Sequence, residues 1–438
     1  MKQRLAVRIR TLVALSGALA ALSGAVHGQV ANEGAIRFRV GAGYTDNVLR
    51  EPADGEEASY TAVGTVLAFD HVSRRVTASV LGDVEHRSYS ESGIDNELYG
   101  DLDASLELAA VIDRFIWVFN NSYGQTRRDP FRIDSPINRE YINVLSTGPL
   151  LMVPVGGRMS LQVSLIGAKR SYEDSSVFDG TSTTAQASLQ RALSTRSSLS
   201  LTLVDRTTDY DRIPIRESTV QNAYVAYQSE LASGAALVAA GVTRVDSESG
   251  SDTAPYVDIS WARDVGARSH LTLSAGSEYV DPAQDFASSR AGGFIPDRIG
   301  DILPSADVYR RSDASIAHVT RYDRLTFEMG ASFARQRYES DTRFGNDERR
   351  FNVSISRQLS TSSALGIGAR VAKREFDETG QEDEDKTARL WWNKRLARRF
   401  FIEIAYQRDQ RDSVIGVGYD ENSVRLFFEV DARPARAL

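Results

Sequence analysis

The chain has 438 residues, no cysteine, a formal net charge of -7 and a mean hydropathy of -0.31. An acidic chain lacks the basic surface that nucleic-acid binding requires, so we expect no nucleic-acid partner. After residue 28 no window approaches 18 uninterrupted apolar residues, which excludes helical membrane proteins.

Residues 1–28 predict a cleaved signal peptide. Four basic residues (Lys2, Arg4, Arg8, Arg10) precede an apolar stretch from Thr11 to Val26. A membrane anchor is the alternative, but the stretch is shorter than the roughly 20 residues that a spanning helix needs. We therefore expect an exported mature chain, residues 29–438, that forms one domain with no soluble appendage and has a charge of -7 - 4 = -11.

Apolar and polar residues alternate along the mature chain. In Ser198–Leu203, Leu199, Leu201 and Leu203 fall on one side and Ser198, Ser200 and Thr202 on the other. Similar alternation recurs at Ile36/Phe38/Val40, Leu98/Leu102/Leu106/Leu108, Leu325/Phe327/Met329, Phe400/Ile402/Ile404 and Val424/Leu426/Phe428. A strand sorts residues in this way and a helix does not. The pattern predicts strands of about 12 residues, slightly longer than a membrane-spanning strand requires.

Short links between these strands alternate with longer polar ones. We expect nine short links at His71–Arg74, Val111–Arg114, Pro154–Gly157, Ser194–Ser197, Ala232–Gly234, Val265–Arg268, Arg321–Asp323, Ser360–Ser363 and Leu396–Arg398. The ten longer links include Thr45–Ser59, Arg128–Arg139, Asp281–Ser305 and Asp377–Asp385.

This arrangement predicts an all-β fold: a transmembrane antiparallel β-barrel of about 20 strands, with 18 and 22 as alternatives, short periplasmic turns and longer extracellular loops. Such a barrel lies in the outer membrane of a Gram-negative cell. A propeller or an array of periplasmic β-sandwiches would share the spacing of roughly 40 residues between short turns. A propeller blade, however, packs four short strands into that length.

Charged residues share the non-apolar side of the strands with Ser, Thr and Gly. The candidate lumen-lining residues are Arg37, Arg39, Asp101, Asp103, Glu107, Glu328, Arg370, Arg389, Arg395, Glu403, Arg425 and Glu429. Arginine pairs with carboxylates and also hydrogen-bonds hydroxyl-rich solutes. The two interpretations, ion pairs that hold the wall and a polar path for anions or sugars, are compatible.

The longest link, Asp281–Ser305, is a candidate constriction. It carries Gly292, Gly293, Phe294 and Ile295, a flexible pair followed by an apolar tip that we expect to fold into the lumen. An external loop is the alternative. Tyr and Trp residues, among them Tyr60, Tyr172, Tyr210 and Trp391, cluster toward strand ends and are interpreted as membrane-interface residues.

We expect no enzymatic activity, no metal site and no cofactor. No HExxH motif, paired-histidine spacing or nucleophile elbow occurs, and His86 and His318 are assigned to the lumen side. Acidic residues at 51–57 and 377–385 are interpreted as solvated loop tips, with binding of divalent cations as the alternative.

A short motif follows the first strand: Tyr44, Asp46, Asn47 and Arg50, within Tyr44–Arg50, ahead of an acidic loop. It resembles the start of outer-membrane barrels of the exopolysaccharide-operon (EpsL-like, putative porin) type. That resemblance implies export of a polysaccharide with a periplasmic polysaccharide-export protein as partner. A general diffusion porin and a barrel acting through adhesive loops are the alternatives. The lipid bilayer, lipopolysaccharide and the outer-membrane assembly machinery are the other expected partners.

Overall fold

A computed structural model describes residues 31–52, 55–91, 93–129, 131–212, 217–248, 250–291, 305 and 307–432. The first ten strands are β1 (Ala31–Thr45), β2 (Ala58–Val72), β3 (Val76–Tyr89), β4 (Glu97–Val111), β5 (Phe115–Arg127), β6 (Arg139–Gly156), β7 (Met159–Tyr172), β8 (Gly180–Ala192), β9 (Ser197–Tyr210) and β10 (Ser218–Leu231). The other ten are β11 (Gly234–Ser247), β12 (Gly250–Val265), β13 (Ser269–Val280), β14 (Tyr309–Tyr322), β15 (Leu325–Tyr338), β16 (Asn346–Ser360), β17 (Ser363–Phe376), β18 (Glu382–Arg395), β19 (Phe400–Ser413) and β20 (Tyr419–Asp431). One α-helix, α2 (Pro282–Ala291), and three single turns, η1 (Pro136–Asn138), η2 (Ser176–Phe178) and η3 (Thr342–Phe344), complete the described elements.

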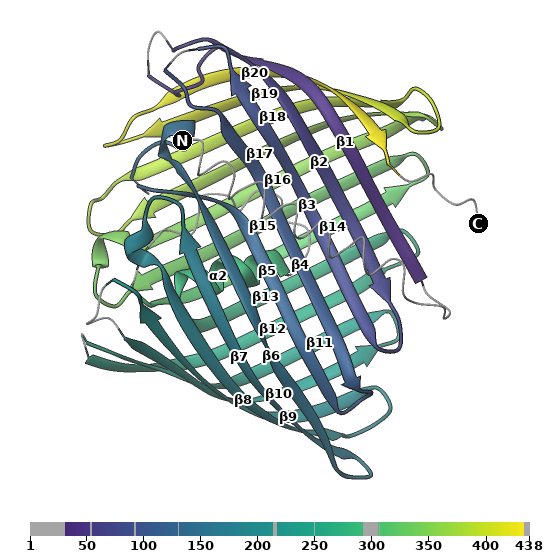
Figure 1. Ribbon diagram of the computed structural model, residues 1–438, viewed down its shortest axis with the longest axis vertical. Coiled ribbons are helices and arrows are strands. Elements are labelled where there is room, and N and C mark those ends of the chain that lie inside the picture. The colour runs from purple at the N-terminus through teal and green to yellow at the C-terminus, as the bar shows by residue number, and fades with distance from the viewer. Residues whose placement is uncertain are drawn as a thin grey trace.

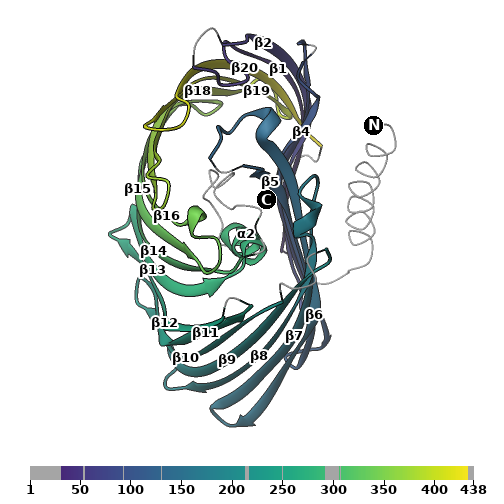
Figure 2. The same ribbon diagram turned by 90° about the vertical axis from the view of Figure 1, so that its left-hand side faces the viewer.

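The strands form one closed antiparallel barrel (Figures 1 and 2). Each strand pairs with its neighbours in the chain, and β1 closes the ring on β20 from Arg37↔Asp431 to Thr45↔Ser423. Closure gives each described strand a partner on both sides, so no strand is left at a free sheet edge. The predicted fold class, an all-β barrel of 20 strands, is confirmed for the described residues, although the strands have 12 to 18 residues rather than about 12.

The two rims of the barrel differ in the length of the links between strands. Between the described strands, nine links of two to four residues lie on one rim at the predicted places, and Asp113 and Asp323 take a left-handed conformation in two of these turns. The other rim carries the longer links, except that only residues 248–249 join β11 to β12. The link predicted at Asp377–Asp385 is wrong in part, because β18 already begins at Glu382.

Helix α2 identifies the inner face of the wall. It lies inside the ring in Figure 2, where Asp285 accepts a hydrogen bond from Arg311 of β14 and Phe286 packs on Ile142 and Tyr172 of the opposite wall. Paired residues on adjacent strands point to the same side, so the register carries this assignment around the barrel. The other side is the outer face.

The two faces differ in composition. Large apolar side chains are exposed on the outer face, among them Leu165, Leu201, Val242, Ile367 and Phe428. The inner face is rich in Arg, Asp, Glu, Ser, Thr and Gln, as the alternation predicts. In the described part of the chain, no helix has the length and apolar composition of a membrane span.

Candidate functional site: the lumen and its constriction

Helix α2 crosses the lumen near the long-loop rim and packs against the far wall. Its Ala283 and Phe286 form a buried cluster with Ile142 and Val144 of β6 and Tyr172 of β7. Phe286 is 3% exposed and Ile142 only 1%. These inner wall residues are apolar where the helix covers them and shields them from water.

Polar contacts fix the start of the helix. Pro282 occupies its first position, and Asp281 Oδ1 accepts a hydrogen bond from the Gln284 backbone N–H at 3.0 Å, an N-cap contact. The same carboxylate pairs with Arg170 of β7 at 3.1 Å, and both side chains are about 95% buried (4% and 5% exposed). Arg206 of β9 donates to the Gln284 side chain.

The other side of the helix is anchored to β14. Tyr309 Oη and Arg311 both donate to the carboxylate of Asp285. Strand β13 also bends inward at this level. Its pairing with β12 ends at Val257↔Ser277, and Tyr279 then packs on the inner residues Val220 and Val245. Helix α2 is therefore held from both walls at once.

The link between β5 and β6, residues 128–138, also reaches across the mouth. Phe131 stacks against Phe344 (ring centroids 5.8 Å apart) and packs at a tilt against Phe376 of β17 (5.0 Å, 50° between the ring planes). Inside this link, Asn138 Nδ2 donates to the carbonyls of Asp129 and Ile133 at 2.9 and 3.0 Å. The loop is thus held both by hydrogen bonds within itself and by aromatic contacts with the opposite wall.

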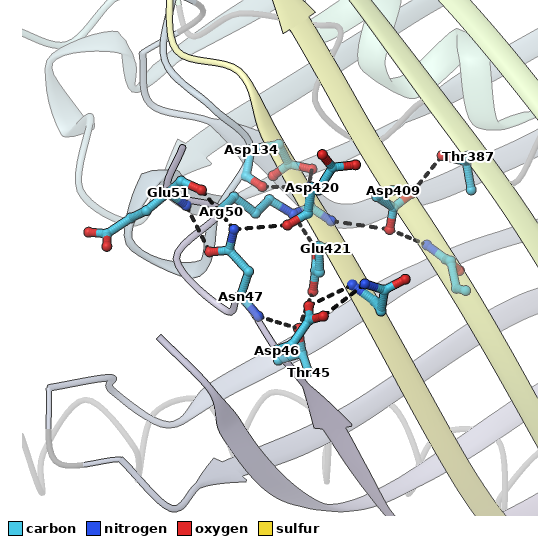
Figure 3. Close-up of polar contacts among 12 residues, drawn as sticks. Thr45, Asp46, Asn47, Arg50, Glu51, Asp134, Thr387, Asp409, Asp420 and Glu421 are labelled. Atoms are coloured by element: carbon cyan, nitrogen blue, oxygen red, sulfur yellow. Dashed lines mark hydrogen bonds and ion pairs between the residues drawn. The ribbon is translucent and has the colours of Figure 1, made fainter. Parts of the chain in front are cut away.

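Arg50 joins the loop after β1 to both this link and the barrel closure (Figure 3). Its Nε donates to Glu421 at 2.7 Å and its Nη1 to the Asp134 carbonyl at 2.6 Å, while Nη2 lies 3.6 Å from Asp409. The guanidinium also lies over the Tyr419 ring at 5.1 Å. We refer to Arg50, Asp134, Asp409, Tyr419 and Glu421 as the Arg50 cluster.

The other residues of the Tyr44–Arg50 motif support this cluster. Asn47 Nδ2 donates to the carbonyls of Glu51 (2.7 Å) and Asp420 (2.9 Å), and Asp46 accepts two hydrogen bonds from Asn422 at 2.7 and 2.8 Å. The motif thus fastens a loop to β20 across the closing seam of the barrel. Tyr44 lies on the outer face and is 42% exposed.

Asp134 and Arg50 each stabilise the charged form of the other, and this shifts the pKa of both groups. Burial alone would raise the pKa of Asp134. The guanidiniums of Arg139, Arg50 and Arg127 outweigh burial and hold that pKa well below its ordinary value. Burial would lower the pKa of Arg50, but Tyr419, Glu421, Asp409 and Asp134 raise it well above its usual range. Both groups are charged throughout the physiological pH range.

The structure places all twelve candidate lumen-lining residues on the inner face. Glu403 accepts from both Arg389 (3.1 Å) and Arg425 (3.2 Å), and Arg37 pairs with Glu429 at 3.4 Å. Other contacts of these residues include Arg37 with Asp431 (3.0 Å), Arg39 with Asp83 (2.9 Å) and Glu85 (2.8 Å), Glu328 with Ser354 (3.2 Å) and Arg395 with the Thr361 carbonyl (3.4 Å). Asp101, Asp103 and Arg370 also have polar partners, and Glu107 is exposed.

The wall opposite these charges, formed by β7, β8 and β9, carries few charged residues. The inner residues of β7, β8 and β9 include Arg170 and Arg206 and many hydroxyls and amides: Ser160, Gln162, Ser164, Ser182, Thr184, Gln186, Ser188, Gln190, Ser198, Ser200 and Thr202. Ser188 and Thr202 hydrogen-bond at 2.9 Å, and Gln190 donates to Ser198 at 3.0 Å. The lumen therefore offers mainly ion pairs on one side and mainly uncharged hydrogen-bonding groups on the other.

Several assignments from the sequence need correction. His86 and His318 were assigned to the lumen side, but their partners Val63 and Met329 place them on the outer face. His318 Nε2 lies 3.2 Å from Thr320 Oγ1, a contact without a serine nucleophile. Gly292, Gly293, Phe294 and Ile295 lie outside the described residues.

The acidic run at 377–385 is not a solvated loop tip throughout. Asp383 lies in β18, is 2% exposed, and accepts hydrogen bonds from Arg411, Gln381 and Ser413. Within the described ranges, no group of three or more acidic or histidine side chains is arranged to hold a metal ion.

Many aromatic residues face the lumen rather than lipid. Tyr60, Tyr172, Tyr210, Tyr338 and Trp391 fall on the inner face by register, and Arg170 lies 4.1 Å from the Tyr210 ring centroid. The sequence carried this signal: each aromatic residue is in phase with the polar residues of its strand. The inner apolar pair Ile142 and Val144 likewise marked a covered section of wall.

No family model and no curated protein matches this chain. The FrpB iron transporter from Neisseria meningitidis (F3-3 variant) is 7% identical, with a TM-score of 0.42, over 94% of this chain and 82% of its own. Pseudomonas aeruginosa OccK3 (OpdO) is 11% identical, with a TM-score of 0.37, over 92% and 96%. Acinetobacter baumannii OccAB4 is 9% identical, with a TM-score of 0.37, over 91% and 98%. None of the three is described as an exopolysaccharide-operon barrel, and similarities this low establish no shared function.

Proposed function

We propose that this chain is an outer-membrane channel for small hydrophilic solutes, narrowed at its long-loop mouth by α2. The main support for this proposal is the difference in polarity between the outer and inner faces of the wall. Over the height of the apolar outer face, from Leu199 to Leu203 on β9 for example, the inner face presents Ser198, Ser200 and Thr202. A wall that is apolar outside and polar inside allows water to enter the interior of a barrel.

Diffusion of small solutes fits this lumen better than export of a polysaccharide. A polymer in transit needs an uninterrupted path, whereas α2 is fixed to both walls and the 128–138 link crosses the same mouth. The Tyr44–Arg50 motif, on which the exopolysaccharide resemblance rests, has a structural role in joining the loop after β1 to β20. A periplasmic export partner is therefore not part of the proposal.

Single-channel conductance in planar bilayers tests the function. The purified full chain is compared with a variant in which residues 282–306 are replaced by a short Gly-Ser linker. This replacement is feasible because Val280 and Tyr309 are paired at the base of the link. We expect a small current from the intact protein and a several-fold larger current from the variant.

A control variant lacks residues 415–417, at the tip of the β19–β20 loop, where Ile415 is 62% exposed. Its current should equal that of the intact protein. Silence of both the intact protein and the linker variant would refute the channel and favour a barrel that acts through its loops. A current that the linker leaves unchanged would refute the role given to α2.

A further inference from the structure

A group of arginines stands on the outer face just above the apolar surface. On β15 the outer residues Met329, Ala331 and Phe333 are followed by Arg335 and Arg337. On β16 the outer residues Val353 and Phe351 are followed by Arg349, which pairs in register with Phe333. We refer to Arg335, Arg337 and Arg349 as the arginine patch.

One shielded carboxylate orients two of the three guanidiniums. Arg335 binds Asp347 through two hydrogen bonds, Nε to Oδ1 at 2.9 Å and Nη2 to Oδ2 at 2.6 Å. Arg337 Nη2 donates to the same Oδ1 at 2.9 Å. Asp347 is 13% exposed, whereas Arg335 and Arg337 are 49% and 39% exposed. Of these three side chains, the two cations are therefore more exposed than the carboxylate that binds them.

Arg349 completes the patch with donors that are only loosely engaged. Its side chain is 61% exposed, and its Nη1 lies 3.7 Å from Glu375, beyond hydrogen-bond distance. Two further carboxylates border the patch: one contacts a patch arginine, and the other has a closer basic partner outside the patch. Asp377 lies 2.8 Å from Arg337, and Glu375 lies 3.0 Å from Lys373.

The position of the patch determines what can reach it. Arginines that face outward directly above an apolar wall lie at the depth of lipid headgroups. On the loop side of the wall, that layer contains the phosphorylated sugars of the outer-leaflet glycolipid. Guanidinium groups bind phosphate through paired, charge-assisted hydrogen bonds.

We propose that the arginine patch binds a phosphate of the outer-leaflet glycolipid headgroup. The proposal rests on the outer-membrane location that is part of the proposed function. Arg335 and Arg337, pre-oriented by Asp347, hold two edges of the phosphate, and Arg349 takes the third. The apolar residues Phe333 and Phe351 below them contact the acyl chains.

The rest of the circumference supplies a matched control. On β11, Arg244 is also an outer residue that follows the apolar residues Val238 and Val242. It binds Asp246 through two hydrogen bonds at 3.0 and 2.8 Å and is 51% exposed. Like Arg335, Arg244 is bound by an Asp through two hydrogen bonds, but it belongs to no group of arginines like the patch. Lipid binding by one outward-facing arginine can therefore be compared with binding by three.

Native mass spectrometry of the full-length protein in detergent measures the affinity. The probe is bis-phosphorylated lipid A, and dephosphorylated lipid A and phosphatidylethanolamine are the comparison lipids. We expect Arg335→Gln/Arg349→Gln to weaken lipid A binding by roughly tenfold or more, since each substitution removes charged hydrogen bonds to phosphate. Arg244→Gln should bind as the unsubstituted protein does.

Equal lipid A binding by the double variant and the unsubstituted protein would overturn the proposal. So would equal affinity for lipid A and its dephosphorylated form. Conductance of the same preparations is measured in parallel and should not change, because the patch lies outside the lumen. Loss of lipid binding with intact conductance supports the patch, whereas absent conductance with intact, patch-dependent lipid binding refutes only the channel.

Discussion

Arg50 is the residue on which the mouth of the barrel depends most directly. It has a positive φ of 60° and contacts three carboxylates that belong to different parts of the chain. Removing one partner from a shielded ion-pair network leaves uncompensated charge, which costs roughly 3 kcal/mol. We therefore expect Arg50→Ala to lower the free energy of unfolding by about that amount, measured by denaturant titration in detergent micelles.

Two further variants distinguish the effect of losing the ion pairs from the effect of the left-handed backbone conformation at residue 50. Arg50→Gly loses the same ion pairs but relieves the left-handed backbone, so it should be about 1 kcal/mol more stable than Arg50→Ala. Arg132→Gln removes a 77% exposed arginine from the 128–138 link and should have no measurable effect. If Arg50→Ala proved as stable as Arg132→Gln, the Arg50 cluster would have no structural role.

Asp134 makes the same cluster sensitive to acid. Its pKa in the folded protein lies below the ordinary value of 3.8, so the carboxylate stabilises the fold at pH values above 3.8. That stabilisation is lost progressively as the pH falls below 3.8 toward the folded-state pKa, because the unfolded chain binds the proton first. We expect the stability difference between the unsubstituted protein and Asp134→Asn to shrink over that window, as followed by unfolding at stepped pH. A difference that stays constant down to about pH 2 would contradict this.

At the scale of the element, α2 is attached to the barrel separately from the hydrogen-bonded wall. Truncating Phe286 removes its packing on Ile142, Val144 and Tyr172, a loss of roughly 3 kcal/mol in a filled site. This free energy holds α2 against the wall and does not contribute to the pairing of the strands. We therefore expect Phe286→Ala to speed amide exchange in residues 282–291 by about 100-fold and to leave amide exchange in the strands unchanged. Phe351→Ala, on the outer face, is the control, and unchanged exchange in α2 would show that other contacts hold the helix.

The strands could be predicted from the sequence, whereas the loop structure could not. Alternation of Leu199, Leu201 and Leu203 with hydroxyl residues is a local property of the chain, and the register follows it. No helix was predicted within the 25-residue link Asp281–Ser305, because the ten residues of α2 show little amphipathic pattern. The helix is held instead by wall residues that are distant in the sequence. The start of β18 was missed because a run of acids conceals alternation. Asp383 is tolerated in the wall because Arg411 pairs with it and Gln381 and Ser413 donate hydrogen bonds to it.

At the scale of the whole molecule, the inner charges could be placed from the sequence but their pairing could not. Period two assigns Arg389 and Glu403 to the same face, yet whether they touch depends on the register between β18 and β19. The aromatic residues show the opposite case. Trp391 was interpreted as a membrane-interface residue from its type, although its phase, between Leu390 and Trp392, already assigns it to the inner face.

The orientation of the barrel follows from its two rims and can be tested with single cysteines, since the chain has none of its own. Bacterial outer-membrane barrels keep short turns in the periplasm and long loops outside. Val177→Cys lies in the β7–β8 loop and Thr361→Cys in the β16–β17 turn, and both positions are exposed. We expect a membrane-impermeant maleimide to label Val177→Cys in intact cells and Thr361→Cys only after the outer membrane is permeabilised. The reverse pattern would invert the barrel and move α2 to the periplasmic mouth. Labelling of neither cysteine before permeabilisation would remove the chain from the cell surface, and with it the basis for placing the arginine patch in the outer leaflet.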